Sequence, residues 1–140
     1  MKKQTLIVAS LCLATGLAAI PASAQAGTVL LAKIPFNFAV MGKTLGAGDY
    51  MMMIVNSDQL KIEDGNGRIA AMALIKDSGR LSGEKGQLIF HCYGDRCFLA
   101  EVWPPHRQHG RELFTSRTEA DLAKGEPGKY FAVLAAESQK

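Results

Sequence analysis

The stretch QLIFHCYGDRCFLAEVW, residues 87–103, decides the fold class of this chain of 140 residues. Two runs rich in apolar and aromatic residues flank Gly94 and Asp95. Such runs are typical of strands, and a Gly-Asp pair between them is typical of a tight hairpin turn. The stretch therefore predicts two antiparallel strands joined by two residues.

Two cysteines lie on this hairpin, and its register places Cys92 opposite Cys97. In the non-hydrogen-bonded pair expected there, the two Cα atoms lie about 4.5 Å apart, a spacing that permits a disulfide. A thioredoxin-like site needs Cys-x-x-Cys at a helix start, and a structural zinc site needs four ligands. We therefore interpret the pair as a structural disulfide, with free thiols or a redox or metal role as the alternatives.

Strand patterns continue along the rest of the chain. In KIPFNFAV, residues 33–40, apolar side chains recur at every second position, and Pro35 favours an edge strand or a strand start because it lacks an N–H. DGNG at residues 64–67 is typical of a hairpin turn, and residues 78–86 have the composition of a polar loop. Further strands are predicted at residues 50–55, 60–63, 68–76 and 129–136.

One short helix is expected after the central hairpin. The paired prolines of PPHRQHG, residues 104–110, cannot continue a strand. Ser116 and Glu119 have the spacing of a capping box, which predicts a helix over about residues 117–124, ended by Gly125 in a left-handed conformation. Together these patterns predict an all-β fold, an antiparallel β-sandwich or small barrel of about seven strands with one short helix.

The first 24 residues have the pattern of a signal peptide. Two lysines precede an apolar run at residues 6–20, which contains Cys12, and Ala22-Ser23-Ala24 forms a small-x-small cleavage site. We expect cleavage after this site and export to the periplasm or the cell exterior. A single β domain over residues 25–140, without a transmembrane segment, is the expected product.

The charge balance excludes one class of partner. The chain has 16 Lys and Arg residues against 13 Asp and Glu residues, a formal net charge of +3. Loss of the two leader lysines lowers this charge to about +1. No stripe of basic residues remains, so we expect no nucleic-acid partner.

A candidate ligand or partner face lies on the hairpin. In the predicted register His91 and Tyr93 share one face with Arg96 and Phe98, and Trp103 ends the second strand. Aromatic and basic side chains of this kind stack on a glycan or another small molecule, or dock a protein. The same side chains also form the cores of small β domains, and this alternative stays open.

No catalytic, cofactor or metal motif is visible. The sequence lacks G-x-S-x-G, H-E-x-x-H and phosphate-binding glycine loops, so we expect neither an enzyme nor a bound cofactor. His106 and His109 lack an obvious third ligand, so no metal is assigned to them. The methionines at 51–53 cannot converge on one ion, and their strand is expected to be covered on both sides, as a central strand or at an interface. Glu101 is expected opposite Leu88, either exposed or lining a polar pocket.

Three segments together resemble a family of small exported bacterial proteins of uncharacterised function. They are IPFNFAVMGKTLGAGDY (34–50), LIFHCYGDRCFLAEVW (88–103) and GRELFTSRTEADLAK (110–124). The first is similar to the family's pattern of an apolar-PF-x-F strand followed by G-K-x-L-P-A-G-x-Y, and departs from it at Gly46, where proline is usual. The resemblance implies an exported all-β domain and supplies no established activity.

The sequence thus favours an exported, non-enzymatic binding or structural β module whose partner is a protein, a small molecule or a glycan. The alternative is an extracytoplasmic carrier of small ligands, with an apolar pocket inside a barrel. A filled interior would favour the module, and an open one the carrier.

Overall fold

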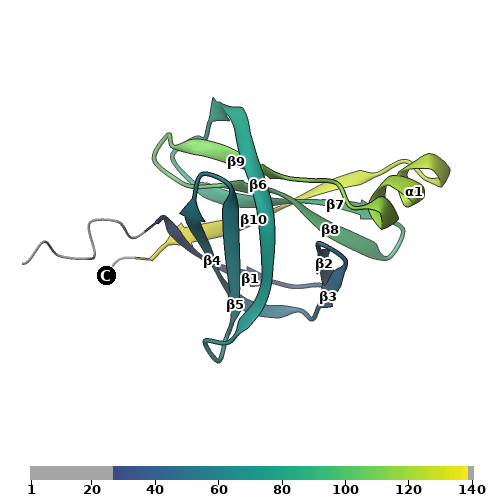
Figure 1. Cartoon of the computed structure of the whole chain (residues 1–140), viewed down its shortest axis with the longest axis horizontal. Coiled ribbons are helices and arrows are strands. Elements are labelled where there is room, and N and C mark those ends of the chain that lie inside the picture. Colours follow the sequence, from purple (N-terminus) through teal and green to yellow (C-terminus); the bar gives the residue numbers. More distant parts are fainter. Residues whose placement is uncertain (1–26, 139–140) are drawn as a thin grey trace, which may run out of the picture.

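The structure is a computed structural model that describes residues 27–138. The predicted signal peptide and Cys12 lie outside these residues. Within them, ten strands and one helix follow one another along the chain (Figure 1). Their bounds are β1 Val29–Ile34, β2 Phe38–Val40, β3 Lys43–Leu45, β4 Gly48–Asn56, β5 Gln59–Asp64, β6 Ile69–Leu81, β7 Gly86–Tyr93, β8 Arg96–Trp103, β9 His109–Leu113, α1 Arg117–Gly125 and β10 Lys129–Glu137.

Eight of the strands close into an antiparallel barrel. Their order is β8-β7-β10-β1-β4-β5-β6-β9, and pairing of β8 with β9 closes the ring. The short β2–β3 hairpin is attached to β8 through one parallel pair, Ala39 with Phe98. The predicted all-β antiparallel fold with one short helix is confirmed. A sandwich of about seven strands is wrong, because the sheet curls until its first and last barrel strands pair, as a barrel requires.

Apolar side chains fill the interior of the barrel. On β1 and β4, buried residues alternate with more exposed ones, as expected for strands with one inward face. The inward side chains of opposite walls meet in one continuous cluster. Its fully buried members include Leu30, Met52, Leu60, Ile62, Leu88, Phe90 and Val102.

Pro35 divides the strand that was predicted over residues 33–40. The chain leaves β1 at Ile34 and re-enters the sheet at Phe38, because proline has no N–H for the ladder. The predicted burial pattern nevertheless holds, since Ile34 and Phe38 are buried. Phe36, between the two strands, packs edge-on against Phe90 with ring centroids 4.9 Å apart.

The predicted polar loop at 78–86 is partly wrong, because β6 continues to Leu81. Its extension pairs with β9, a strand that the sequence did not predict, and Leu81 lies opposite His109. The ladder shifts register where Gly79 takes a left-handed φ of 77° and donates its N–H to the Asp77 carboxylate at 2.7 Å. Glycine adopts this φ without strain, so the shift bends the strand and the strand does not end there.

The predicted helix is confirmed as α1, which lies beyond the end of the β7–β8 hairpin (Figure 1). Ser116 is its N-cap and accepts a hydrogen bond from the Glu119 N–H at 3.1 Å. The predicted left-handed Gly125 is wrong: the helix ends in an extended C-cap, Glu126, whose N–H donates to the Leu122 carbonyl. Within residues 27–138, no helix is long and apolar enough to cross a membrane.

Candidate functional site

The hairpin of β7 and β8 has the predicted turn and disulfide. Tyr93 pairs with Arg96 and Cys92 with Cys97, and the sulfurs of Cys92 and Cys97 are bonded at 2.03 Å. Gly94 has the left-handed φ of 63° that this tight turn requires. Both cysteines belong to the barrel cluster, where Cys92 is buried and Cys97 partly buried. The pair therefore joins the two strands on their inner side, away from the candidate face.

Further along the hairpin a β-bulge changes the predicted register. The ladder shifts between Ile89 and Phe90, so that Glu101 pairs with Ile89, while Leu88 pairs with Val102. The predicted pairing of Glu101 with Leu88 is therefore wrong. One extra residue in β8 moves every later side chain to the opposite face. As a result Glu101 lies on the outside of the barrel and lines a polar depression.

At the centre of the candidate face, His91 and Tyr93 meet Glu119 of α1. The Glu119 carboxylate accepts a hydrogen bond from the Tyr93 hydroxyl at 3.1 Å, and the same oxygen lies 3.3 Å from Nδ1 of His91. Glu119 is the one buried residue of the helix, with 8% of its side chain exposed. Burial in the first place, and then the hydrogen bond and charge of Glu119, raise the pKa of Tyr93 above its ordinary value.

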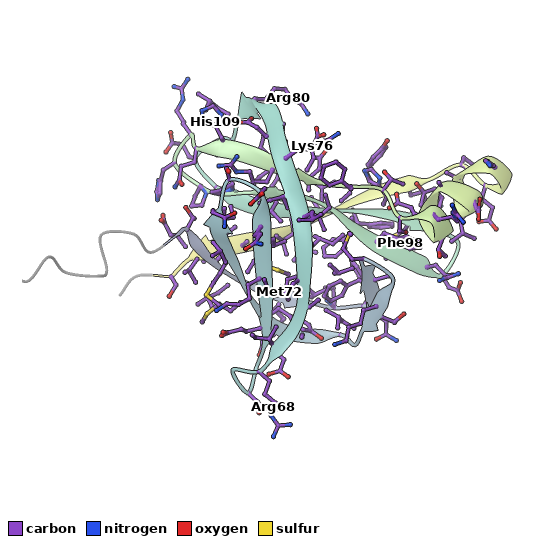
Figure 2. The ribbon with its side chains drawn as sticks, viewed as in Figure 1. Arg68, Met72, Lys76, Arg80, Phe98 and His109 are labelled. Atoms are coloured by element: carbon purple, nitrogen blue, oxygen red, sulfur yellow. A yellow bond between two sulfur atoms is a disulfide. The ribbon has the colours of Figure 1, made fainter. Side chains whose placement is uncertain are left out.

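The other predicted residues of this face lie in two separate places: Phe98 and Arg96 lie near Tyr93, and Trp103 lies at the end of β8. Phe98 and Tyr93 form a small cluster against which Leu122 of α1 packs, and the Arg96 guanidinium lies 5.7 Å from the Phe98 ring centre. Figure 2 shows Phe98 on the side of the barrel nearest α1. The helix thus packs against Tyr93 and Phe98, in keeping with the alternative that these aromatic side chains form part of a core. Of these side chains, Arg96 is exposed.

Trp103 lies further along β8, near the opposite end of the barrel. Its indole N–H donates to Glu101 at 2.7 Å, and the Arg80 guanidinium lies 5.4 Å from the ring centre. Its ring rests on Gly110 of β9, where a Cβ atom would lie 2.4 Å from two ring carbons. In Figure 2 Arg80 and His109 mark this end of the molecule. Trp103 is therefore buried and does not join the other predicted residues.

A polar depression of about 210 Å³ lies between these two places. Glu101, Glu112 and Glu119 contribute carboxylates to its wall, and Lys76 contributes an ammonium group. Each carboxylate already has a partner: Glu101 accepts from Trp103, Glu119 from Tyr93, and Glu112 lies 3.9 Å from Lys76. Each of the three carboxylates thus makes a contact within the fold.

His91 is enclosed between α1 and β10. Its Nδ1 faces Glu119, which resembles the orientation of a catalytic histidine, but its Nε2 is buried and has no hydrogen-bond partner. The Tyr130 ring stands edge-on to the imidazole with ring centroids 4.5 Å apart. The contact between His91 and Glu119 therefore serves to dock α1 on the barrel.

The two loop histidines diverge. His106 lies between Glu84 and Glu137, with nitrogen–oxygen distances of 3.8 and 3.6 Å. His109 lies 3.3 Å from Asp77, whose pKa is lowered first by the Gly79 N–H and then by nearby positive charge. Among residues 27–138, no three His, Cys, Asp or Glu side chains are placed to hold a metal ion.

The methionine strand β4 pairs with β1 on one edge and β5 on the other, as a central strand does. Met52 points inward and is fully buried, whereas Met51 and Met53 point outward and are half-buried. The opposite orientation of neighbouring methionines follows the predicted period of two. Met51 on the outer side of β4 lines a depression of about 550 Å³, and a second depression, of about 470 Å³, adjoins it at Leu31 of β1.

Sequence reasoning missed the docking role of Glu119 and the outer surface around Leu31. Glu119 was recognised as half of a capping box, a local pattern that says nothing about the barrel wall beneath it. Residues 29–32 and 50–55 are continuously apolar, so no alternation in the sequence marked Leu31 and Met51 as outward-facing. Comparisons with protein-family models, with curated proteins and with solved structures find no match to this chain.

Proposed function

We propose that this chain is an exported, non-enzymatic binding module that meets its partner on the outside of the barrel. The filled interior is the observation that supports this proposal. Leu30, Met52 and Phe90 come from three different strands, have no exposed surface and belong to one cluster. A β domain packed in this way leaves its outward side chains for recognition.

The alternative function, a carrier of small ligands, needs an open pocket within the barrel. The larger depressions, of about 550 and 470 Å³, instead include outward-facing residues such as Leu31, Lys33 and Glu137. This arrangement favours the module over the carrier. The pairing of polar groups around Glu119 likewise favours a protein without catalytic activity of its own.

Export is the second part of the proposal, and it rests on the signal-peptide pattern of residues 1–24. The Cys92–Cys97 disulfide is compatible with an oxidising compartment. Membership of the family of small exported β proteins is proposed on the three resembling segments quoted above.

Native mass spectrometry of the protein purified from its own cell envelope tests both parts. We expect a chain that begins at Gln25, two hydrogens lighter than its reduced form, without a bound apolar molecule. A stoichiometric apolar ligand that survives purification would support the carrier instead. An intact leader in the envelope fraction would contradict the predicted cleavage.

A photo-crosslinking amino acid tests where the partner binds. It is placed at the exposed, outward positions Leu134, Met72 and Phe114, and at Asn66 in the β5–β6 turn as a control. We expect a crosslinked macromolecule from at least one of the three wall positions and none from the turn. No crosslink from any wall position would refute binding on the outside of the barrel.

A further inference from the structure

We propose that the outer face of β10, β1 and β4 is a docking groove for an apolar peptide segment flanked by basic residues. This inference rests on the proposed function and names the chemistry of the partner. The Leu31 groove, as we call it, consists of the two larger depressions, which have Leu31 in common.

The floor of the groove is a cross-strand row of side chains. Leu31 pairs with Ala136 of β10 on one side and with Met51 of β4 on the other, and Met51 pairs with Glu63 of β5. Leu31 is 43% exposed, and Leu134, on the same wall, is 69% exposed. Apolar surface that spans several strands in this way marks an interaction site more often than a scattered single residue does.

Methionine suits such a floor. Met51 and Met53 point to the same outer side, and Met72 continues this face on β6, where it lies opposite Lys61. The flexible, polarizable thioether adapts to partners of different shape, and methionine-rich surfaces commonly bind amphipathic segments. A partner on the outer side of β4 also accounts for the expectation from the sequence that this strand is covered on both sides.

A partner in this groove would bind through side-chain contacts and would not add a strand to the sheet. β10, β1, β4 and β5 each pair with a neighbour on both edges, so no backbone N–H row is free beneath it. Four strands spaced about 4.8 Å apart span about 14 Å, the length of about ten residues of α-helix. An amphipathic helix laid across the strands therefore fits the width of the groove.

The charged side chains around the groove determine which sign of charge the partner should carry. Glu84 and Glu137 lie at one end, with His106 between them, and Asp49, Glu63 and Asp64 lie at the other. Lys33 and Lys85 are the lysines of the same wall, and Lys61 nearby is paired with Glu63 at 3.4 Å. Carboxylates thus outnumber lysines here, although the whole sequence has a net charge of +3.

A segment with lysine or arginine on either side of its apolar residues complements both ends of the groove. Two other occupants are disfavoured by the same charges. A second copy of the chain, related by a two-fold axis, would bring like carboxylates together. An anionic lipid surface would be repelled by the acidic rim.

Fluorescence anisotropy with two labelled peptides tests the inference at physiological ionic strength. One is an amphipathic helix of about 14 residues made of leucine and lysine, and the other has glutamate in place of lysine. We expect the Leu/Lys peptide to bind with a dissociation constant of about 10 µM and the Leu/Glu peptide at least about tenfold more weakly. Equal binding of the two peptides would overturn the proposed charge preference.

Paired variants locate the binding. Leu31→Ser with Met51→Ser removes the floor of the groove, and Leu81→Ser with Phe114→Ser removes exposed apolar side chains elsewhere. All four side chains are at least partly exposed, so both variants should keep the wild-type far-UV circular dichroism. We expect the first variant to bind about tenfold more weakly and the second to match wild type.

An equal loss in both variants, or no loss in the first, would refute the groove. Dimerisation that disappears in the first variant would identify a second copy as the occupant, and groove-dependent binding to phosphatidylglycerol vesicles would identify a lipid; either result overturns the inference. Failure here is distinct from failure of the proposed function, which is decided by the ligand content of the native protein and by the crosslink from Phe114, a residue outside the groove.

Discussion

Replacing Glu119 by alanine should loosen α1 from the barrel and lower the free energy of unfolding. The change removes the acceptor of the Tyr93 hydroxyl and the neighbour of His91 Nδ1, and both groups are partly or fully buried. A buried polar group left without a partner costs about 1–3 kcal/mol. We therefore expect a loss of about 1–3 kcal/mol, and about 1 kcal/mol for Glu119→Gln, which keeps an acceptor for Tyr93.

Urea titration followed by circular dichroism measures this loss. Asp121→Ala is the matched control, because Asp121 is exposed on the same helix and its ion pair with Lys124 lies on the surface. Exposed pairs of this kind contribute less than about 1 kcal/mol. In a double-mutant cycle, Tyr93→Phe should lose part of its effect when Glu119 is already alanine. Full additivity, or equal effects of the two helix variants, would refute the docking role of Glu119.

The pH dependence gives a second readout of the same contact. Because the folded-state pKa of Tyr93 is raised above 10.0, its contribution to stability is present below the ordinary pKa and is lost as the pH rises through the raised value. Glu119→Ala removes the part of the increase in the Tyr93 pKa that is due to Glu119 and leaves the part that is due to burial. Above about pH 10 the wild type should therefore lose stability more steeply than the variant. Parallel pH profiles of the two proteins would contradict this assignment.

Three further predictions concern other parts of the fold. Gly110→Ala should lower the free energy of unfolding by about 1–3 kcal/mol and change the near-ultraviolet circular dichroism of Trp103, because the new Cβ overlaps its ring. Reduction of the Cys92–Cys97 disulfide should lower the free energy of unfolding by less than the usual value of about 2–4 kcal/mol, because the closed loop is small. The urea midpoints of the oxidised and reduced proteins measure this difference. The pKa of Asp77 is lowered, so its contribution to the free energy of unfolding is present above about pH 4 and is lost as the pH falls through the folded-state pKa. In Asp77→Asn, the free energy of unfolding should therefore depend less steeply on pH in that range. A pH profile unchanged from that of the wild type would contradict this prediction.

Local signals predicted the elements that depend on neighbours in the sequence. The turn at Gly94, the facing cysteines and the start of the helix at Ser116 each follow from residues within a few positions of one another. The family resemblance added export and an all-β domain as expectations. Closure of the barrel depends on contacts between β8 and β9 that no local pattern specifies, and the sequence left sandwich and barrel open for that reason.

The wrong register predicted for Glu101 has the same origin, because it depends on a feature that no local pattern specifies. A single extra residue in β8 moved Glu101 from the inner to the outer side, and nothing in the sequence of the hairpin marks where such a bulge falls. The sequence left open whether Tyr93 and Phe98 form an available face or pack as core, and the contact with Leu122 of α1 shows them packed. A strand pattern gives the side on which a residue lies, and tertiary contacts decide whether that side is free.

These corrections change where a partner can bind. The hairpin, although rich in aromatic residues, uses Tyr93 to hold α1, and Trp103 is closed off against β9. The barrel interior is filled, and the acidic groups of the polar depression are paired within the fold. Among residues 27–138, the wall around Leu31 is open and spans several adjacent strands, and Leu31 has no distinctive chemistry of its own. Recognition by shape and charge at such a surface needs no motif, which explains why a search of the sequence for reactive residues would pass over it.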